Sequence, residues 1–227
     1  DVACDASLVA RATSGRPVKL QWMREDEFGW EPFGSAMVMK LQARLDERGQ
    51  VVDWRHETWS HPHTTRPGGP GSNLIAGWHI ANPVAMGAPV NGPQPSGAAD
   101  RNAVPLYVFP NQRILPHFLP EMPLRTSALR TLGAYANVFA LASFIDELAA
   151  AANADTVEFR LRHLQDPRAR AVIEAAANKA GWQPRRKGDG THGRGIAFAK
   201  YKNLAAYVAV VADVVIDRRS GNVRVEK

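Results

Sequence analysis

The chain has 227 residues, of which 45% are hydrophobic and 22% are charged, and its formal net charge is +6. This composition excludes a disordered or fibrous chain and is sufficient for a hydrophobic core. The single cysteine, Cys4, excludes an internal disulfide framework and any cysteine-based metal or iron–sulfur site within this chain. We expect Cys4 to be a small core residue on an apolar helix face. No run of about 18 apolar residues is present, so no membrane span is expected.

Basic residues are scattered along the sequence, and residues 185–187 form their one cluster. Scattered charge is typical of a solvated surface, and no nucleic-acid-binding motif accompanies it, so no nucleic-acid partner is expected. The chain lacks an initiator methionine and stops within an alternating strand pattern. We therefore expect an internal piece of a longer polypeptide, for which the absence of a signal peptide says nothing about compartment.

The N-terminal third predicts a helix followed by strands. Residues 5–14 have a helical pattern with Leu8, Val9 and Ala12 facing inward, and residues 18–23 alternate as a strand. Residues 24–27 are acidic and polar and are interpreted as a break. A hairpin follows, because two alternating segments flank a glycine-bearing connection; the segments are residues 37–46 and 51–59.

Residues 61–123 contain most of the prolines and many glycines, which excludes a long helix or a central strand. Only residues 104–109 and 113–118 are short extended candidates. A segment of this length without a long helix or a central strand is unusual in a compact domain, and it indicates a functional loop or a surface covered by a partner.

Three histidines, His56, His61 and His63, lie close together at the start of this crossing. The sequence His61-Pro62-His63 could place two imidazoles on one side of an extended segment, and a metal site would then need a third ligand and supporting carboxylates. Glu57 points to the opposite side of the strand from His56. The alternative is that they are solvent-facing or hydrogen-bonded to backbone groups, and no metal site is predicted.

The second half predicts three helices and then strands. Apolar residues recur at helical spacing from Val138 to Ala152, Asp155 is typical of an N-cap, and Asp166-Pro167 is typical of another helix start. Residues 195–199 and 204–217 are predicted strands, the second apolar on both faces and therefore covered on both. Hairpins with segregated helices indicate the α+β class.

Residues 124–136 bring two arginines, three hydroxyl side chains and a glycine to the start of the longest helix. Backbone N–H groups at a helix start lack intrahelical partners, so such a loop can bind an anion. The alternative is an ordinary helix start with surface arginines.

Familiar catalytic motifs are missing: no Gly-x-Ser-x-Gly, no phosphate-binding loop of the Walker type and no His-Glu-x-x-His is present. Residues 188–193 spell Gly-x-Gly-x-x-Gly, but they follow a helix and precede a strand. This is the reverse of the dinucleotide-binding context, so the segment is interpreted as a loop.

Several segments, in order and spacing, resemble the large, molybdopterin-binding subunit of the molybdenum hydroxylases, the family of xanthine dehydrogenase and aldehyde oxidase. They are residues 15–27, 128–136, 139–149, 159–164, 181–182 and 193–197. The segments at residues 30–33 and 132–137 are most similar to bacterial members of the nicotinate dehydrogenase-like type, with the isoquinoline oxidoreductase-like branch close by. The resemblance implies an α+β part of the molybdopterin-binding region, and it leaves cytoplasm and periplasm open as compartments.

In the family, the loop matched by residues 128–136 approaches the molybdenum cofactor and shapes the substrate pocket. The cofactor-binding residues implied here are Arg130, Thr131, Leu132, Gly133 and Ala134. Thr131 and Ala134 replace family glycines, and a Cβ there restricts backbone approach.

The substrate pocket implied by the resemblance comprises Trp30, Glu31, Phe33 and Leu132. Leu132 replaces an aromatic residue that stacks over substrate in purine oxidisers. Glu31 lies near the region where xanthine-specific members carry an arginine. These departures argue against xanthine as substrate.

The implied reaction is hydroxylation of an N-heterocycle or aldehyde with water-derived oxygen. The family's base glutamate lies in a Gly-x-Gly-Glu motif that this chain lacks, so we predict no catalytic residue here, and a fragment that is inactive and free of molybdopterin when isolated. The implied partners are the rest of the large subunit, an iron–sulfur subunit or domain, and a small-molecule substrate.

We expect residues 1–165 to close a first molybdopterin-binding domain and residues 166–227 to open a second. The alternative function is an autonomous protein-binding module, or a scaffold that bridges subunits without catalysis.

Overall fold

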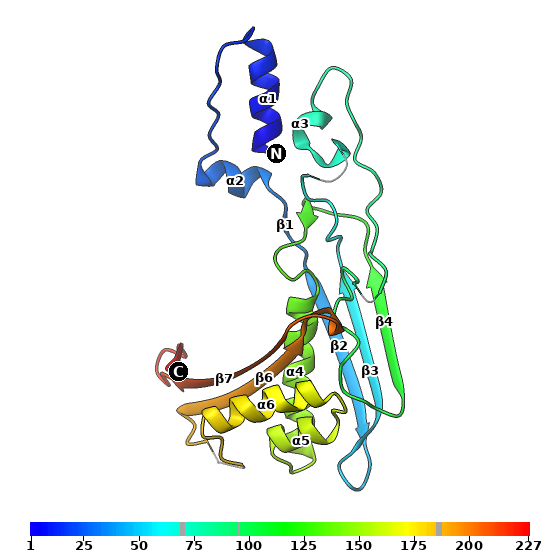
Figure 1. Cartoon of the computed structure of the whole chain (residues 1–227), viewed down its shortest axis with the longest axis vertical. Coiled ribbons are helices and arrows are strands. Elements are labelled where there is room, and N and C mark those ends of the chain that lie inside the picture. Colours follow the sequence, from blue (N-terminus) through cyan, green and yellow to red (C-terminus); the bar gives the residue numbers. More distant parts are fainter. Residues whose placement is uncertain (69–70, 95, 185–187) are drawn as a thin grey trace. The chain divides into compact units, whose positions relative to one another are not determined.

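The computed structural model describes residues 1–68, 71–94, 96–184 and 188–227. The chain combines helices with three separate sheets, which confirms the α+β class (Figure 1). The basic cluster at residues 185–187 lies outside the described residues. In chain order the elements are α1 (Val2–Ala12), α2 (Arg24–Trp30), β1 (Phe33–Gly34), β2 (Met37–Leu45), β3 (Val51–Ser60), the 3₁₀ turn η1 (Gly71–Asn73), α3 (Ile75–Trp78), β4 (Gln112–Phe118), β5 (Thr126–Ser127), α4 (Ala134–Ala151), α5 (Thr156–Arg162), α6 (Pro167–Lys179), β6 (His192–Lys200), the 3₁₀ turn η2 (Tyr201–Asn203), β7 (Tyr207–Ile216) and β8 (Val223–Val225).

The chain forms two compact units. The first comprises Asp1–Val38, Trp59–Ala99 and Pro116–Gly133, and the second comprises Met39–Thr58, Asp100–Leu115 and Ala134–Lys227. Within this chain, α6 belongs to the second unit together with α4 and α5. The predicted boundary at Asp166 concerns the domains of a longer protein, and it stays a prediction.

The large hydrophobic core lies in the second unit. α4 buries Ile145, Leu148 and Ala149, as its helical spacing predicted. Trp54 of β3 stacks on Phe109 with ring centroids 5.0 Å apart. The helices and the strands of this unit therefore share one apolar interior.

Within the described part of the chain, α4 is the one helix that is long and apolar enough by composition to cross a membrane. A helix that packs in a protein core meets the same criteria, and several α4 residues belong to the core. The expected absence of a membrane span thus stays an expectation.

Both predicted N-caps are confirmed. Asp155 accepts backbone N–H groups of α5 at 2.9 and 3.2 Å, and Asp166 accepts those of α6 at 3.0 and 3.1 Å. These bonds satisfy donors that have no intrahelical partner. Pro167 occupies the first turn, where its missing N–H costs nothing.

The predicted hairpin is confirmed as β2 and β3, which are neighbours in the sheet β2-β3-β4. Asp46 accepts the N–H groups of Arg48 and Gln50, at 2.9 and 2.8 Å, and Gly49 has φ +70°. The extended prediction at residues 113–118 is confirmed as β4, whereas residues 104–109 form bends and irregular backbone rather than a strand.

The C-terminal sheet is antiparallel in the order β6-β7-β8. On the side of β6 and β7 that faces the helices, Ile196 and Phe198 are buried and Tyr207, Ala209 and Val211 are partly buried, and α6 lies along this side (Figure 1). The prediction that β7 is covered on both faces is wrong for this chain, because Val208 and Val210 are exposed.

Four N-terminal predictions are corrected. Residues 18–23 alternate in burial but pair with no strand among the described residues, and residues 24–27 begin helix α2 instead of a break. The acidic residues that suggested a break stabilise the first turn of α2, where Asp26 accepts the Met23 N–H at 2.8 Å. Val9 and Ala12 are exposed, and Cys4 is only half-buried, because α1 buries none of its residues.

Candidate functional site

The candidate cofactor-binding segment is a tight bend that directly precedes α4. The N–H of Leu132 donates to the Leu129 carbonyl at 3.1 Å, which closes a β-turn with Arg130 and Thr131 at its centre. Thr131 has φ +81° and Leu132 has φ +55°. A positive φ at the third position is the type II geometry that favours glycine. Thr131 therefore adopts a backbone conformation that favours glycine, at the expense of strain.

Gly133 is required by packing within the first unit. Its N–H donates to the Ala98 carbonyl at 3.0 Å, and a Cβ added to it would lie 2.2 Å from the Ala99 oxygen. The main chain of Gly133 is thus covered by residues of this chain. Position 133 therefore needs glycine, because the backbone of residues 98 and 99 lies too close for a side chain.

The remaining bend residues differ in exposure. Arg130 is exposed and makes no hydrogen bond or ion pair with the described part of the chain, whereas Thr131 and Leu132 are half-buried. Ala134 is the first residue of α4, is 5% exposed and has no positive φ, so alanine fits without backbone strain where the family has glycine. A free guanidinium beside a helix start suits an anionic group.

The predicted pocket residues lie beside the segment that leads to the bend. Phe33 of β1 pairs in parallel with Thr126 of β5, and an added Cβ on Gly34 would lie 2.8 Å from the Leu129 side chain. Trp30 and Phe33 are exposed. Leu129 therefore packs beside this strand, and no described contact joins Leu132 to it. Glu31 lies 3.7 Å from the amino group of Asp1.

Arg125 holds this part of the first unit together, a role that the sequence did not predict. Its guanidinium donates to the carbonyls of Trp30 at 3.2 Å and Asn73 at 2.6 Å, and to the Asp1 carboxylate at 2.7 Å. It also lies over the Trp78 ring, 5.4 Å from the centroid. Two of these acceptors are backbone carbonyls of distant residues, so no sequence motif could have identified them.

The three histidines do not converge on a metal, and no group of three potential ligands occurs among the described residues. His61 bonds to the Glu121 carbonyl at 2.7 Å, and His63 contacts the Ser60 hydroxyl at 3.0 Å. His56 belongs to a separate buried network.

A buried polar network anchors the first turn of α4 in the second unit. The Thr58 hydroxyl donates to the Asn137 amide oxygen at 2.7 Å, and the Asn137 amide donates to the Arg101 carbonyl at 3.1 Å. His56 Nε2 lies 3.2 Å from the Thr58 hydroxyl and must donate to it, because the hydroxyl proton is already used. Burial lowers the pKa of His56 to about 4 against the opposing hydrogen bonds of Ala103 and Asn137, so this histidine is neutral near pH 7.

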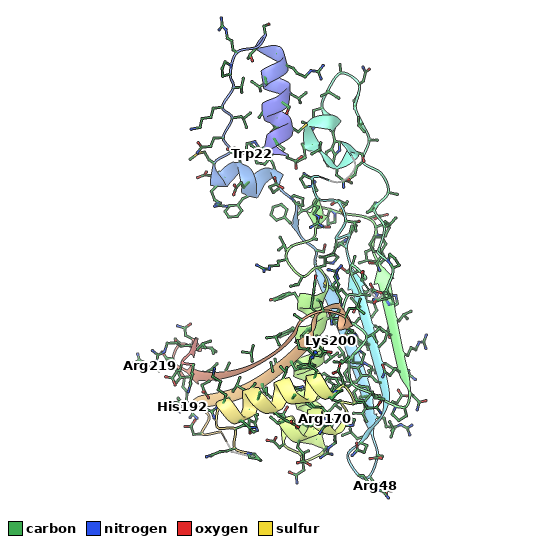
Figure 2. The ribbon with its side chains drawn as sticks, in the orientation of Figure 1. Trp22, Arg48, Arg170, His192, Lys200 and Arg219 are labelled. Carbon is green, nitrogen blue, oxygen red and sulfur yellow. The ribbon has the colours of Figure 1, made fainter. Side chains whose placement is uncertain are left out.

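The first unit also contains a cavity of about 550 Å³ beside the N-terminal helices. Trp30 lines it together with Trp22, whose indole N–H donates to Asp5 at 3.1 Å (Figure 2). Leu8 and Ile80 are among the other lining residues. Of the four predicted pocket residues, Trp30 alone lines this cavity.

Comparison with known proteins relates the whole chain to part of larger enzymes. It is 38% identical over 240 aligned positions to a nicotinate dehydrogenase subunit of Pseudomonas putida KT2440, covering 100% of this chain and 19% of that protein. It is 30% identical to the beta subunit of isoquinoline 1-oxidoreductase from Brevundimonas diminuta, covering 98% of this chain and 26% of that protein. The chain thus spans about a fifth to a quarter of these relatives. No family model matches it.

Two solved structures share the fold. Aldehyde oxidoreductase from Desulfovibrio gigas matches 84% of this chain and 20% of its own, with a TM-score of 0.55 and 20% identity. Quinoline 2-oxidoreductase from Pseudomonas putida 86 matches 96% of this chain and 29% of its own, with a TM-score of 0.55 and 17% identity.

The chain is therefore similar in sequence to part of two oxidoreductase subunits, and the solved structures that share its fold are molybdenum hydroxylases. In particular, it corresponds to a portion of the type of subunit found in nicotinate dehydrogenase and in isoquinoline 1-oxidoreductase.

Proposed function

We propose that this chain forms walls of the cofactor and substrate sites in the large subunit of a molybdenum hydroxylase that oxidises an N-heterocycle or an aldehyde with water-derived oxygen. The observation that supports this most directly is the bend before α4, where Arg130 is exposed and unpaired among the described residues. Sequence similarity of 38% and 30% to two N-heterocycle-oxidising subunits, as their names state, supports the substrate class.

The residues of the bend fit an anionic cofactor in part. Arg130 would hold an anionic group of molybdopterin, because its guanidinium is free and presents several donors. Gly133 is covered by Ala98 and Ala99, so its main chain is not offered to the cofactor. When bound, the molybdenum cofactor supplies the two-electron oxidation of the substrate.

The residues of this chain would bind and orient the substrate, and they would not transfer protons. Phe33 and Trp30 offer exposed aromatic surface next to β5, which suits the face of a planar heterocycle. Arg125 keeps Trp30 in place by bonding to its carbonyl. The base is expected outside this chain, so the isolated chain is expected to be inactive.

The test is made in the complete enzyme, purified with its partner subunit. Its molybdenum and pterin content are measured, and its turnover is screened over aldehydes and N-heterocycles. Arg130→Ala is expected to lower molybdenum content or turnover at least about tenfold. Arg48→Ala is the matched control, because Arg48 is also an exposed turn arginine and should have no effect (Figure 2).

Two results would contradict the proposal. If Arg130→Ala leaves both molybdenum content and turnover intact, the bend is a scaffold, and the alternative of a role in bridging subunits is favoured. If the isolated 227-residue chain carries molybdenum and reduces a dye with substrate, its predicted inactivity is wrong.

A further inference from the structure

One face of the C-terminal sheet is apolar and uncovered. The register of β6 and β7 pairs Ala197 with Val210 and Ala199 with Val208, and β8 adds Val225 opposite Val214. Paired residues project from the same face of a sheet. The uncovered face, here called the valine face, comprises Gly193, Gly195, Ala197, Ala199, Val208, Val210, Ala212, Val214, Ile216, Val223 and Val225.

The valine face is open in this chain. Val208, Val210, Ile216, Val223 and Val225 on this face are between 37% and 68% exposed, and Val214 is half-buried. A Cβ added to Gly195 would meet no atom within 4 Å. The opposite face packs against the core through Ile196 and Phe198, which are at most 5% exposed.

The valine face carries no charged side chain. The charged residues of the same strands lie on the helix side, where Arg194 pairs with Asp213 and Lys200 lies 3.2 Å from Asp166. An antiparallel sheet that meets water on one side normally alternates apolar and polar residues. The sheet therefore has the composition of one buried on both faces.

Strand β2 of the same unit provides an internal comparison. Its exposed positions in this unit are Lys40, Gln42 and Arg44, and the alternate positions Leu41 and Ala43 pack against the core. This chain thus places polar residues on a face meant for solvent. The valine face departs from that rule over three strands.

We propose that the valine face is an interface within the large subunit, covered by an apolar layer of the same polypeptide that lies outside these 227 residues. The inference rests on the proposed function, in which this chain is one part of a subunit. Its curated relatives are four to five times longer than the matched region, which covers 19% and 26% of them, so ample polypeptide exists to form that layer.

The chemistry of the face selects this occupant over a separate subunit. Interfaces between separately folded proteins usually contain polar groups and a polar rim, whereas a face without charged side chains resembles the interior of a domain or of an obligate complex. A contiguous exposed apolar patch of this kind on a finished protein would promote association. A covering layer of the same subunit removes that surface as the subunit folds.

Cysteine accessibility tests the proposal. Val210→Cys, and Val208→Cys as a second variant, are made in a Cys4→Ser background, and labelling by N-ethylmaleimide is followed by peptide mass spectrometry. Gln42→Cys on the open face of β2 is the matched control. The isolated chain should label quickly at all three positions. In the complete large subunit without its partner subunit, labelling at positions 208 and 210 should be at least about tenfold slower, because a covered thiol reacts only on local opening.

Each other outcome overturns the proposal. Protection that appears only when the partner subunit is added assigns the face to that subunit. Protection in the isolated chain that is lost on dilution assigns it to a second copy of the chain. Rapid labelling in every preparation means that the face stays open. Molybdenum content is measured in parallel, so that failure of the proposed function is distinguished from failure of this inference.

Discussion

The substitution Gly133→Ala tests the close packing that positions the bend. A Cβ at this position would lie 2.2 Å from the Ala99 oxygen, 2.6 Å from the Ala98 oxygen and 2.7 Å from the Ala99 carbonyl carbon. All three atoms belong to the main chain, so none of them can be relieved by a side-chain rotation. The backbone must move, which also disturbs the bond from the Gly133 N–H to the Ala98 carbonyl.

We expect Gly133→Ala to lower the free energy of unfolding by about 3 kcal/mol, the upper part of the usual range for overpacking. The loss is measured by urea unfolding with tryptophan fluorescence, as a shift of the midpoint at constant slope. Gly29→Ala is the matched control, because an added Cβ there meets no atom within 4 Å and φ is not positive. Since Gly29 lies inside α2, alanine there should raise stability by about 0.5–1 kcal/mol.

If Gly133→Ala unfolds at the same urea concentration as the parent chain, the close approach of residues 98–99 to the bend is wrong. The packing explanation for this glycine would then be withdrawn. If both glycine variants lose stability equally, the effect comes from the substitution itself, and the contact with Ala98 and Ala99 is not its cause.

Three further changes have defined outcomes. Thr131→Gly should stabilise the chain by about 1 kcal/mol in urea unfolding, because glycine adopts φ +81° without the penalty of a β-branched side chain. The free energy of unfolding of the parent chain should fall by roughly 3 kcal/mol as pH decreases from about 6.5 to 4. In the unfolded chain His56 gains a proton near pH 6.5, whereas the buried His56 gains one only near pH 4. The variant His56→Gln should reduce this pH dependence. Arg160→Met should cost about 3 kcal/mol, because the fully buried guanidinium donates to the Ile196 carbonyl, the Ala142 carbonyl and the Asp146 carboxylate, and all three would lose this donor.

Each of these outcomes has a control. A loss of stability in Thr131→Gly would show that the turn is not strained. Burial also lowers the pKa of His163, so a pH dependence that remains in His56→Gln belongs to His163, and an unchanged dependence would contradict the role of His56. Arg162→Met controls for the loss of a helix arginine, since Arg162 pairs with the exposed Glu158 and should matter little.

Local signals in the sequence predicted much of the second unit. The N-caps Asp155 and Asp166 and the turn between β2 and β3 were identified correctly, because each acts on backbone groups within a few residues. The helical spacing of α4 identified its buried side for the same reason. In contrast, the prediction for residues 24–27 was wrong, since these acidic residues were interpreted as a break and instead form the first turn of α2.

The candidate site was predicted only in outline. The bend before α4 and the family resemblance came from the sequence, and the site residues of the bend stay a prediction. Three sets of contacts join residues that are tens of positions apart. They are the hydrogen bonds of Arg125, the packing of Ala98 and Ala99 against Gly133, and the network of His56, Thr58 and Asn137. Contacts over such separations leave no periodic or spacing signal in a single sequence.

The sequence by itself determined the class of the fold, most element starts and the resemblance to the molybdenum hydroxylases, because these depend on local backbone chemistry and on the order of short motifs. Only the tertiary structure decided which apolar residues are buried. The alternation in β7 made both faces apolar, but the packing of α6 on one side left Val208 and Val210 open. The physical reason is that burial depends on which other element packs against a face. The apolar residues of a strand favour burial but do not determine what covers them.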